Sequence, residues 1–152
     1  MATVAYRDSV MAADSACFDS SLYQGEVDKL WVLPSVGLVG CCGEIGAMIQ
    51  VVDWLQGKVD RGKKPDLPDD CDFEGLVVDP QGQVLHYDRH LVPIRISNAF
   101  HAIGSGRKLA LGAMEAGASA EQAVRIACRY DHISREPVKT IRLQDVNHDV
   151  SA

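Results

Sequence analysis

Two hydrophobic patterns follow one another along the chain: the two-residue alternation of strands and the three- and four-residue spacing of helices. Their order is the feature that most constrains the fold. From Glu44 to Leu55 apolar residues recur at three- and four-residue spacing until Gly57 ends the pattern, which predicts a helix with one buried face. Strand patterns lie on both sides of this helix, and two more helical patterns and a last strand follow. Each helix has one apolar stripe that a sheet must cover. We therefore expect an α+β fold, a four-layer αββα sandwich of two antiparallel sheets with helices outside.

Three of the predicted strand pairs meet at turns typical of hairpins. Their turns are Arg7-Asp8-Ser9, Pro34-Ser35 between Val27 to Leu33 and Val36 to Cys42, and Pro80-Gln81-Gly82 between Glu74 to Asp79 and Gln83 to Tyr87. Further strands are predicted at Val92 to Ile96, Phe100 to Ile103 and Val138 to Leu143. The later helices are predicted at Lys108 to Glu115 and Ser119 to Tyr130, the second opened by a capping box of Ser119 and Gln122.

The length of 152 residues is that of one domain, and 47% hydrophobic with 24% charged residues is a globular composition. We expect a single domain over residues 1–143 and a polar, frayed tail over residues 144–152. The stretch GKVDRGKKPDLPDD, almost wholly polar with two prolines, is predicted to be a surface loop and the most mobile internal segment.

Composition also excludes several classes of function. A net charge of −6 opposes the phosphate attraction that nucleic-acid binders need. The sequence has no apolar run of membrane-spanning length and its start lacks the features of a signal peptide, so we expect a cytoplasmic protein with no membrane partner. Five cysteines without a CxxC pair predict free thiols. His86 and His90 lie on a strand and turn, where four-residue spacing does not converge on a metal, so no metal or cofactor is expected.

Two glycine-containing segments lie between a predicted strand and a predicted helix. The glycines of Gly40 to Gly46 could serve tight packing of the strand against the helix, or the segment could aim backbone N–H groups at a developing oxyanion. A nucleotide-binding loop is disfavoured, because Cys41 stands where the dinucleotide fingerprint needs glycine. Gly104-Ser105-Gly106 lacks the glycine spacing of a nucleophile elbow, since Ile103 and Arg107 occupy those positions. Ser105 is therefore either a helix N-cap or an orienting hydroxyl.

Asp14, Lys29 and Asp131 are ordinary strand-end or surface charges when considered singly, but six segments taken in order resemble the landmarks of a known family. The segments are Thr3-Val4-Ala5, Ala12-Ala13-Asp14-Ser15, Asp28-Lys29-Leu30, Gly40-Cys41-Cys42-Gly43, Ala102-Ile103-Gly104-Ser105-Gly106 and Asp131-His132-Ile133-Ser134. Their order and spacing resemble the proteasome β-subunit and HslV peptidase family, and most of all its short phage and bacterial members. The resemblance extends from residue 2 to about residue 143.

The resemblance implies an N-terminal-nucleophile hydrolase, in which a threonine freed by processing attacks a peptide carbonyl with its own α-amine as base. Asp14 would then hold the N-terminal strand, and the Lys29 cation would favour deprotonation of the hydroxyl and the amine. The N–H of Gly43 would donate to the oxyanion. Ser105, Asp131 and Ser134 would orient the terminal amine.

One departure from the family pattern decides activity: the position of the nucleophilic threonine holds Ala2, whose methyl group cannot attack a carbonyl. Thr3 is a poor substitute because neighbouring side chains on a strand point to opposite faces, so its hydroxyl is expected to face away from Lys29. Two origins fit the alanine: an inactivating replacement of threonine, or a natural subunit that keeps the scaffold without catalysis. Arg135 also stands where the family usually has glycine.

By resemblance, we expect a threonine-type peptidase subunit that works on peptide or unfolded protein within a homo-oligomeric ring, and that is inactive with Ala2. An ATP-dependent unfoldase would be its partner, and a phage-encoded member would act in the cytoplasm of the bacterial host. The alternative is a non-catalytic structural or assembly protein with the same fold.

Overall fold

The computed structural model describes residues 2–58 and 62–146 of the chain. Eleven strands and three helices are found there. In chain order they are β1 (Thr3–Arg7), β2 (Val10–Ala13), β3 (Ala16–Asp19), β4 (Leu22–Glu26), β5 (Leu30–Leu33), β6 (Gly37–Gly43), α1 (Ile45–Gln56), β7 (Phe73–Val78), β8 (Val84–Tyr87), β9 (Ile94–Ile96), β10 (Phe100–Gly104), α2 (Arg107–Glu115), α3 (Ala120–Tyr130) and β11 (Lys139–Arg142).

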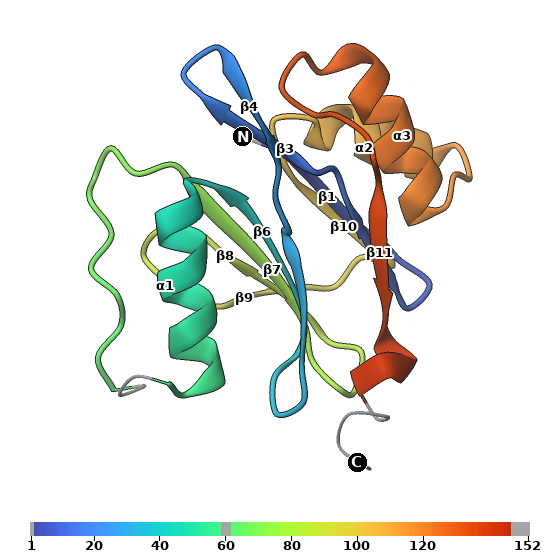
Figure 1. Ribbon diagram of the computed structural model, residues 1–152. Coiled ribbons are helices and arrows are strands. Elements are labelled where there is room, and N and C mark those ends of the chain that lie inside the picture. The colour runs from blue at the N-terminus through green and yellow to red at the C-terminus, as the bar shows by residue number, and fades with distance from the viewer. Residues whose placement is uncertain (1, 59–61, 147–152) are drawn as a thin grey trace.

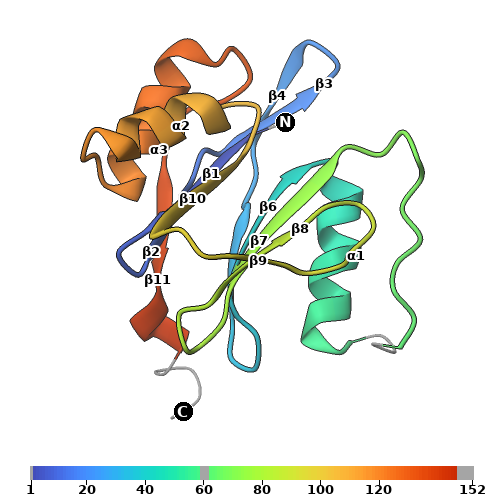
Figure 2. The same ribbon diagram turned by 180° about the vertical axis from the view of Figure 1, so that it is seen from behind.

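Two antiparallel sheets form the centre of the molecule. One has the strand order β10-β1-β2-β11 and the other the order β5-β6-β7-β8-β9, and every pairing within them is antiparallel. Helix α1 lies on the outer side of the five-stranded sheet, whereas α2 and α3 lie on the outer side of the four-stranded sheet (Figures 1 and 2). The expected α+β sandwich of four layers is confirmed.

Strand alternation explains the three apolar layers between these elements. In β1, Val4 and Tyr6 face the other sheet and pack with Leu38 and Leu76, whereas Ala5 faces α2 and α3. On the far side, α1 packs Met48 and Val51 onto the five-stranded sheet. Small residues dominate the layer under α2 and α3, which lets these helices approach the sheet closely.

Most of the predicted elements are present. The three hairpins, α1 and the Ser119–Gln122 capping box agree with prediction, and both reciprocal bonds of the box are formed. The turn between β1 and β2 places Asp8 and Ser9 at φ of 52° and 65°, the left-handed pair of a two-residue hairpin turn.

Two sequence predictions were wrong in detail. The hairpin of β3 and β4 was not predicted; it forms a separate two-stranded ribbon that projects beyond the two sheets (Figure 1). The expected tail begins with a helical turn over residues 143–146, in which Val146 is buried against the inter-sheet layer. Residues 147–152 lie outside the described part of the chain, as do residues 59–61 of the loop predicted to be the most mobile.

That loop is not wholly a surface segment. Leu67 in the loop and Cys71 directly after it are buried in the same cluster as α1, so the end of the loop covers part of the helix. No helix in the described residues is long and apolar enough to span a membrane.

Candidate functional site

A buried ion pair lies where β2 ends and β5 begins. The Lys29 Nζ is 2.9 Å from Asp14 Oδ1, and the side chains are 1% and 0% exposed. Asp14 Oδ1 also accepts the Thr3 N–H at 3.0 Å, while Oδ2 accepts the N–H groups of Ala16 and Arg135, each at 3.1 Å. Four donors compensate the desolvation of this carboxylate, which fixes the start of β1 next to the lysine.

A chain of three hydroxyl groups and one carboxylate lies on the other side of residues 2 and 3. Asp131 Oδ2 accepts from Ser105 Oγ at 2.7 Å and from Ser134 Oγ. Ser134 Oγ lies 2.8 Å from Thr3 Oγ1. Ser105 Oγ is also 3.2 Å from the carbonyl oxygen of Ala2. The end of β10, the loop after α3 and the start of β1 therefore meet at one point.

The directions of these hydrogen bonds follow from the chemistry of the groups. An ionised carboxylate only accepts, so Ser134 donates to Asp131 and the Thr3 hydroxyl must donate to Ser134. Ser105 has a single hydroxyl hydrogen, and Asp131 is its nearer acceptor. The same hydroxyl hydrogen has the Ala2 carbonyl oxygen as its second acceptor, at 3.2 Å.

Residues 2 and 3 present their side chains to opposite faces of the sheet. Ala2 is fully buried in the inter-sheet layer that also holds Val4 and Cys42. Thr3 Oγ1 faces the other way, toward Gly106; a Cβ at Gly106 would lie only 2.0 Å from it. The arrangement agrees with the expectation that the Thr3 hydroxyl points away from Lys29.

The Gly43 N–H has a direction that the neighbouring strands determine. The Cys41 N–H donates to the Lys29 carbonyl on the β5 side, at 3.0 Å. Because N–H groups alternate between the two sides of a strand, the Gly43 N–H also points to the β5 side, beyond the first residue of β5. Gly43 has a φ of 113°, and a Cβ there would lie 1.8 Å from the Asp72 carbonyl oxygen, so only glycine fits.

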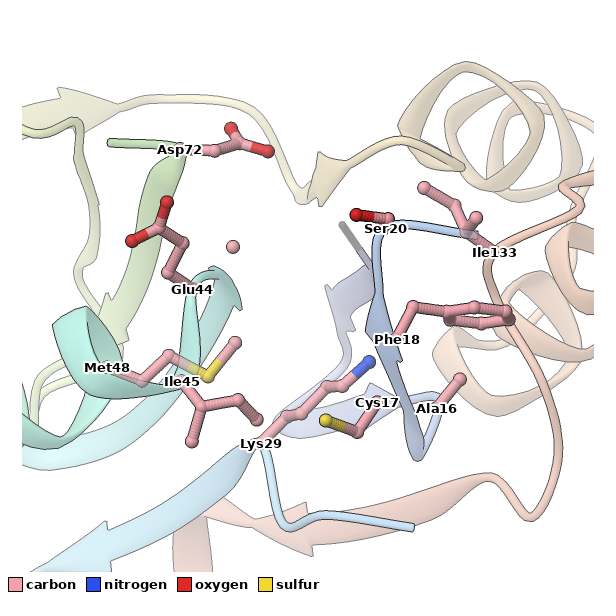
Figure 3. A pocket seen from close by; sticks show the side chains of 11 residues that line it. Ala16, Cys17, Phe18, Ser20, Lys29, Glu44, Ile45, Met48, Asp72 and Ile133 are labelled. Carbon is pink, nitrogen blue, oxygen red and sulfur yellow. The ribbon is translucent and has the colours of Figure 1, made fainter. Parts of the chain in front are cut away.

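Lys29 and Gly43 share a cavity of about 370 Å³, here called the Lys29 cavity (Figure 3). It is lined by Ala16, Cys17, Phe18, Ser20, Lys29, Gly43, Glu44, Ile45, Met48, Asp72 and Ile133. The Lys29 ammonium points into it, between the β3–β4 ribbon and the start of α1 (Figure 3). A molecule in the cavity would therefore meet both a cation and the N–H side of Gly43.

The seven residues singled out from the sequence fall into two groups joined by residues 2 and 3. Asp14 and Lys29 are bonded to each other, and Ser105, Asp131 and Ser134 are bonded to one another. Of the seven, Lys29 and Gly43 line the cavity, whereas the side chain of Ala2 is packed in the inter-sheet layer. Ser105 does not cap a helix: Gly106 is the N-cap of α2 and has no side-chain cap bond. Of its two interpretations, the orienting hydroxyl agrees with the geometry.

Buried Cys42 lies beside Gly104, near the Ala2 carbonyl. Its Sγ would be 2.9 Å from a Cβ at Gly104, a position that also adjoins the Ala2 carbonyl. Burial raises the pKa of the Cys42 thiol well above its usual range, while the nearby Lys29 charge acts in the opposite direction. Cys42 is thus a neutral packing residue and not a thiolate nucleophile.

Sequence reasoning missed a second polar cluster between the sheets. Glu74 Oε2 lies 3.1 Å from His86 Nε2, and His86 Nδ1 lies 3.1 Å from His101 Nε2. Glu74 Oε1 accepts the Gly104 N–H at 3.2 Å, one residue before Ser105. The register of the β7–β8 hairpin puts Glu74 and His86 on diagonal positions of one face and could have indicated their contact. His101 comes from the other sheet, and no local pattern indicates its position.

The histidine pair predicts a pH dependence of stability. Burial and the neighbouring His86 lower the pKa of His101 below 6.5. Because the pKa of His101 is lower in the folded than in the unfolded protein, neutral His101 contributes stability above its unfolded pKa. This contribution is lost as the pH falls through the folded pKa. The pKa of Glu74 is lowered too, chiefly by its bond from His86, so its contribution is lost only below about 4.5.

We expect the melting temperature to fall between pH 7.5 and pH 5.5, and the His101→Gln variant to lose less over this interval. Thermal melts at fixed ionic strength measure the difference, and exposed His90 provides His90→Gln as the control. Equal pH profiles for the wild type and the His101→Gln variant would contradict the assignment.

Within the described residues, no group of three or more His, Cys, Asp or Glu side chains has the arrangement of a metal site. What the site does offer is a buried cation, an N–H at a cavity and a serine hydroxyl next to the backbone of residue 2. These groups suit chemistry in which a hydroxyl on residue 2 loses a proton and an oxyanion forms.

Comparison with known proteins connects the fold to solved structures. No protein-family model fits the sequence, and no curated protein matches it. Among solved structures, eukaryotic HslV from Trypanosoma brucei has a TM-score of 0.70 at 19% identity, over 93% of this chain and 98% of that chain. The chain has the HslV fold.

A second neighbour carries the same HslV fold. BPH of Thiobacillus denitrificans, in complex with epoxomicin, has a TM-score of 0.69 at 19% identity, over 93% of this chain and 98% of that chain. A further BPH structure gives a TM-score of 0.69 at 20% identity, over 93% and 97%. The resemblance found in the sequence motifs is thereby confirmed at the level of the fold.

Proposed function

We propose that this chain is a threonine-type peptidase subunit whose nucleophile position, residue 2, holds alanine. The observation that carries the proposal is the meeting of two bonded groups at residues 2 and 3: the Asp14–Lys29 pair on the Thr3 N–H, and Ser105 and Ser134 around the Ala2 carbonyl and the Thr3 hydroxyl. Both the HslV fold and the six sequence motifs support it.

With threonine as the first residue, the proposed reaction starts at the residue-2 hydroxyl. Its oxygen attacks the peptide carbonyl carbon while its proton passes to the α-amine of the same residue, and the Lys29 charge favours this ionisation. The Gly43 N–H donates to the oxyanion of the tetrahedral intermediate. The intermediate then breaks its C–N bond, and the amine leaves with the proton held by the α-ammonium.

An acyl ester on residue 2 remains, and water completes the cycle. The α-amine takes a proton from the attacking water, and collapse of the second intermediate returns the hydroxyl and releases the acid. In this proposal Ser105 accepts a hydrogen bond from the α-amine, and Asp131 orients both serines. Asp14 holds the strand and the lysine in place.

Beyond this chain, we propose that the subunits form a homo-oligomeric ring whose substrate is peptide or unfolded protein. An ATP-dependent unfoldase is the proposed partner. The proposed location is the cytoplasm, that of a bacterial host if the protein is phage-encoded. A non-catalytic assembly subunit is the second candidate function. The observation that favours it is Ala2, because a methyl group supplies no nucleophile.

Epoxomicin, bound by the Thiobacillus neighbour, tests the proposal. We expect the Ala2→Thr variant, produced with threonine as its first residue, to gain the mass of one epoxomicin per chain, and the Ala2 protein to gain none. Intact-mass spectrometry measures the adduct. A folded variant that stays unmodified at millimolar epoxomicin would favour the assembly function.

A further inference from the structure

We propose that the Lys29 cavity binds a positively charged side chain of the peptide, lysine or arginine, on the acyl side of the cleaved bond. The inference rests on the proposed function and names the substrate class of that site. A carbonyl held at residue 2 with its oxygen toward the Gly43 N–H has its own side chain next to the Lys29 cavity.

Two carboxylates give this cavity its charge. Glu44 and Asp72 both line it, and they lie on one side of it, across from Cys17 and Phe18 (Figure 3). Their backbones are tied together, because the Glu44 N–H donates to the Asp72 carbonyl at 2.9 Å. The positive end of α1 also favours a carboxylate at Glu44, but that effect does not account for Asp72.

No cation in the described part of the chain forms an ion pair with either of these two carboxylates. Neither Glu44 nor Asp72 takes part in any ion pair found among residues 2–58 and 62–146. The one cation in the cavity, Lys29, is already paired with buried Asp14 at 2.9 Å. Among the described residues, the two carboxylates that line the cavity therefore have no ion-pair partner.

A neighbouring thiol responds to the same negative field. Burial is the largest cause of the raised pKa of the Cys71 thiol. The Glu44 charge, the hydrogen bond to Glu44 and the Asp72 charge raise it further, in that order. Cys71 Sγ lies 3.7 Å from Glu44 Oε2. A cation in the same place would feel the opposite, favourable interaction.

The remaining walls suit the stem of a long basic side chain. Met48, Ile45, Phe18 and Ile133 line the cavity with apolar atoms. Lysine and arginine combine an apolar stem with a charged end that stays near water, and both carboxylates are exposed at the mouth. An acidic side chain would meet two like charges there, and a neutral one would gain only the apolar contact.

Arginine and citrulline peptides test the proposal, because citrulline has the shape of arginine without its charge. In the Ala2→Thr background we expect kcat/KM for the arginine peptide to exceed that for the citrulline peptide by about tenfold at low ionic strength. The Glu44→Gln/Asp72→Asn variant should bring this ratio close to one. The remote pair Asp66→Asn/Glu115→Gln changes net charge equally outside the cavity and should leave the ratio as it was.

A binding measurement keeps the test independent of hydrolysis. In the Ala2 protein, half-buried Cys17 lines the cavity and Cys128 does not, so iodoacetamide labelling of Cys17, mapped by mass spectrometry, reports occupancy. The arginine peptide should slow Cys17 labelling at concentrations at which the citrulline peptide has no effect, while Cys128 is unaffected. Equal protection by both peptides, or a ratio that survives Glu44→Gln/Asp72→Asn, would overturn the proposal even if peptide hydrolysis occurs.

The two proposals fail in different ways. If the Ala2→Thr variant cleaves no peptide but the arginine peptide still protects Cys17 selectively, the peptidase function fails and the charge preference of the cavity stands. If hydrolysis occurs without preference for arginine, the function stands and the substrate class is wrong.

Discussion

Replacing Ala2 with threonine, in a chain that starts at this position, is expected to raise the rate of peptide hydrolysis by on the order of 10⁴-fold. The rest of the proposed machinery is already held in place by hydrogen bonds, so the substitution adds the missing hydroxyl together with one methyl group. A fluorogenic peptide with an arginine before the cleaved bond measures the rate, and product analysis by mass spectrometry identifies the bond.

The matched control is Ala2→Val, which adds the same volume without a hydroxyl. It should stay at the background rate of the Ala2 protein, whereas Ala2→Ser should recover part of the activity. Equal rates for the threonine and valine variants would show that hydrolysis does not depend on the hydroxyl and would favour the non-catalytic assembly function.

Removing the Lys29 charge is expected to damage both stability and activity. The Lys29→Ala variant removes the cation from the fully buried Asp14, which costs roughly 3–5 kcal/mol and lowers the melting temperature by on the order of 10 °C. In the Ala2→Thr background the same change should abolish hydrolysis. Lys139→Ala is the matched control, because that lysine pairs with Asp28 at the surface, where a pair contributes about 1 kcal/mol or less.

The double variant Lys29→Met/Asp14→Asn separates the two effects. It removes both charges, so stability should return in part while hydrolysis stays lost. Recovery of hydrolysis together with stability would mean that Lys29 acts only on the fold.

Local patterns were enough to predict the elements whose signals lie within one segment. Helix α1 follows from the spacing of its buried residues, and α3 from its capping box. The β3–β4 ribbon was missed because it buries little on either face, so its sequence lacks the alternation that marks a strand in a sheet. Val146 was missed because the segment was read as polar throughout, although Leu143, Val146 and Val150 recur at three- and four-residue spacing.

The candidate site was predicted from the order of six motifs and not from any physical pattern in the sequence. Its determinants are mostly backbone groups: Asp14 accepts from the N–H groups of residues 3, 16 and 135, and every residue except proline has such a backbone donor. The direction of the Gly43 N–H depends on pairing with β5. Likewise, the Glu74–His86–His101 contact requires two sheets to meet, which no local spacing encodes.

The central claim is that the side chain of residue 2 faces the Lys29 ammonium and its backbone faces Ser105. A crystal structure of the Ala2→Thr variant with its first residue at position 2 tests this claim most directly. We expect the residue-2 hydroxyl oxygen within about 3 Å of Lys29 Nζ, and the α-amine within hydrogen-bond distance of Ser105 Oγ. A hydroxyl turned away from Lys29, toward α2 and α3 as that of Thr3 is, would contradict it.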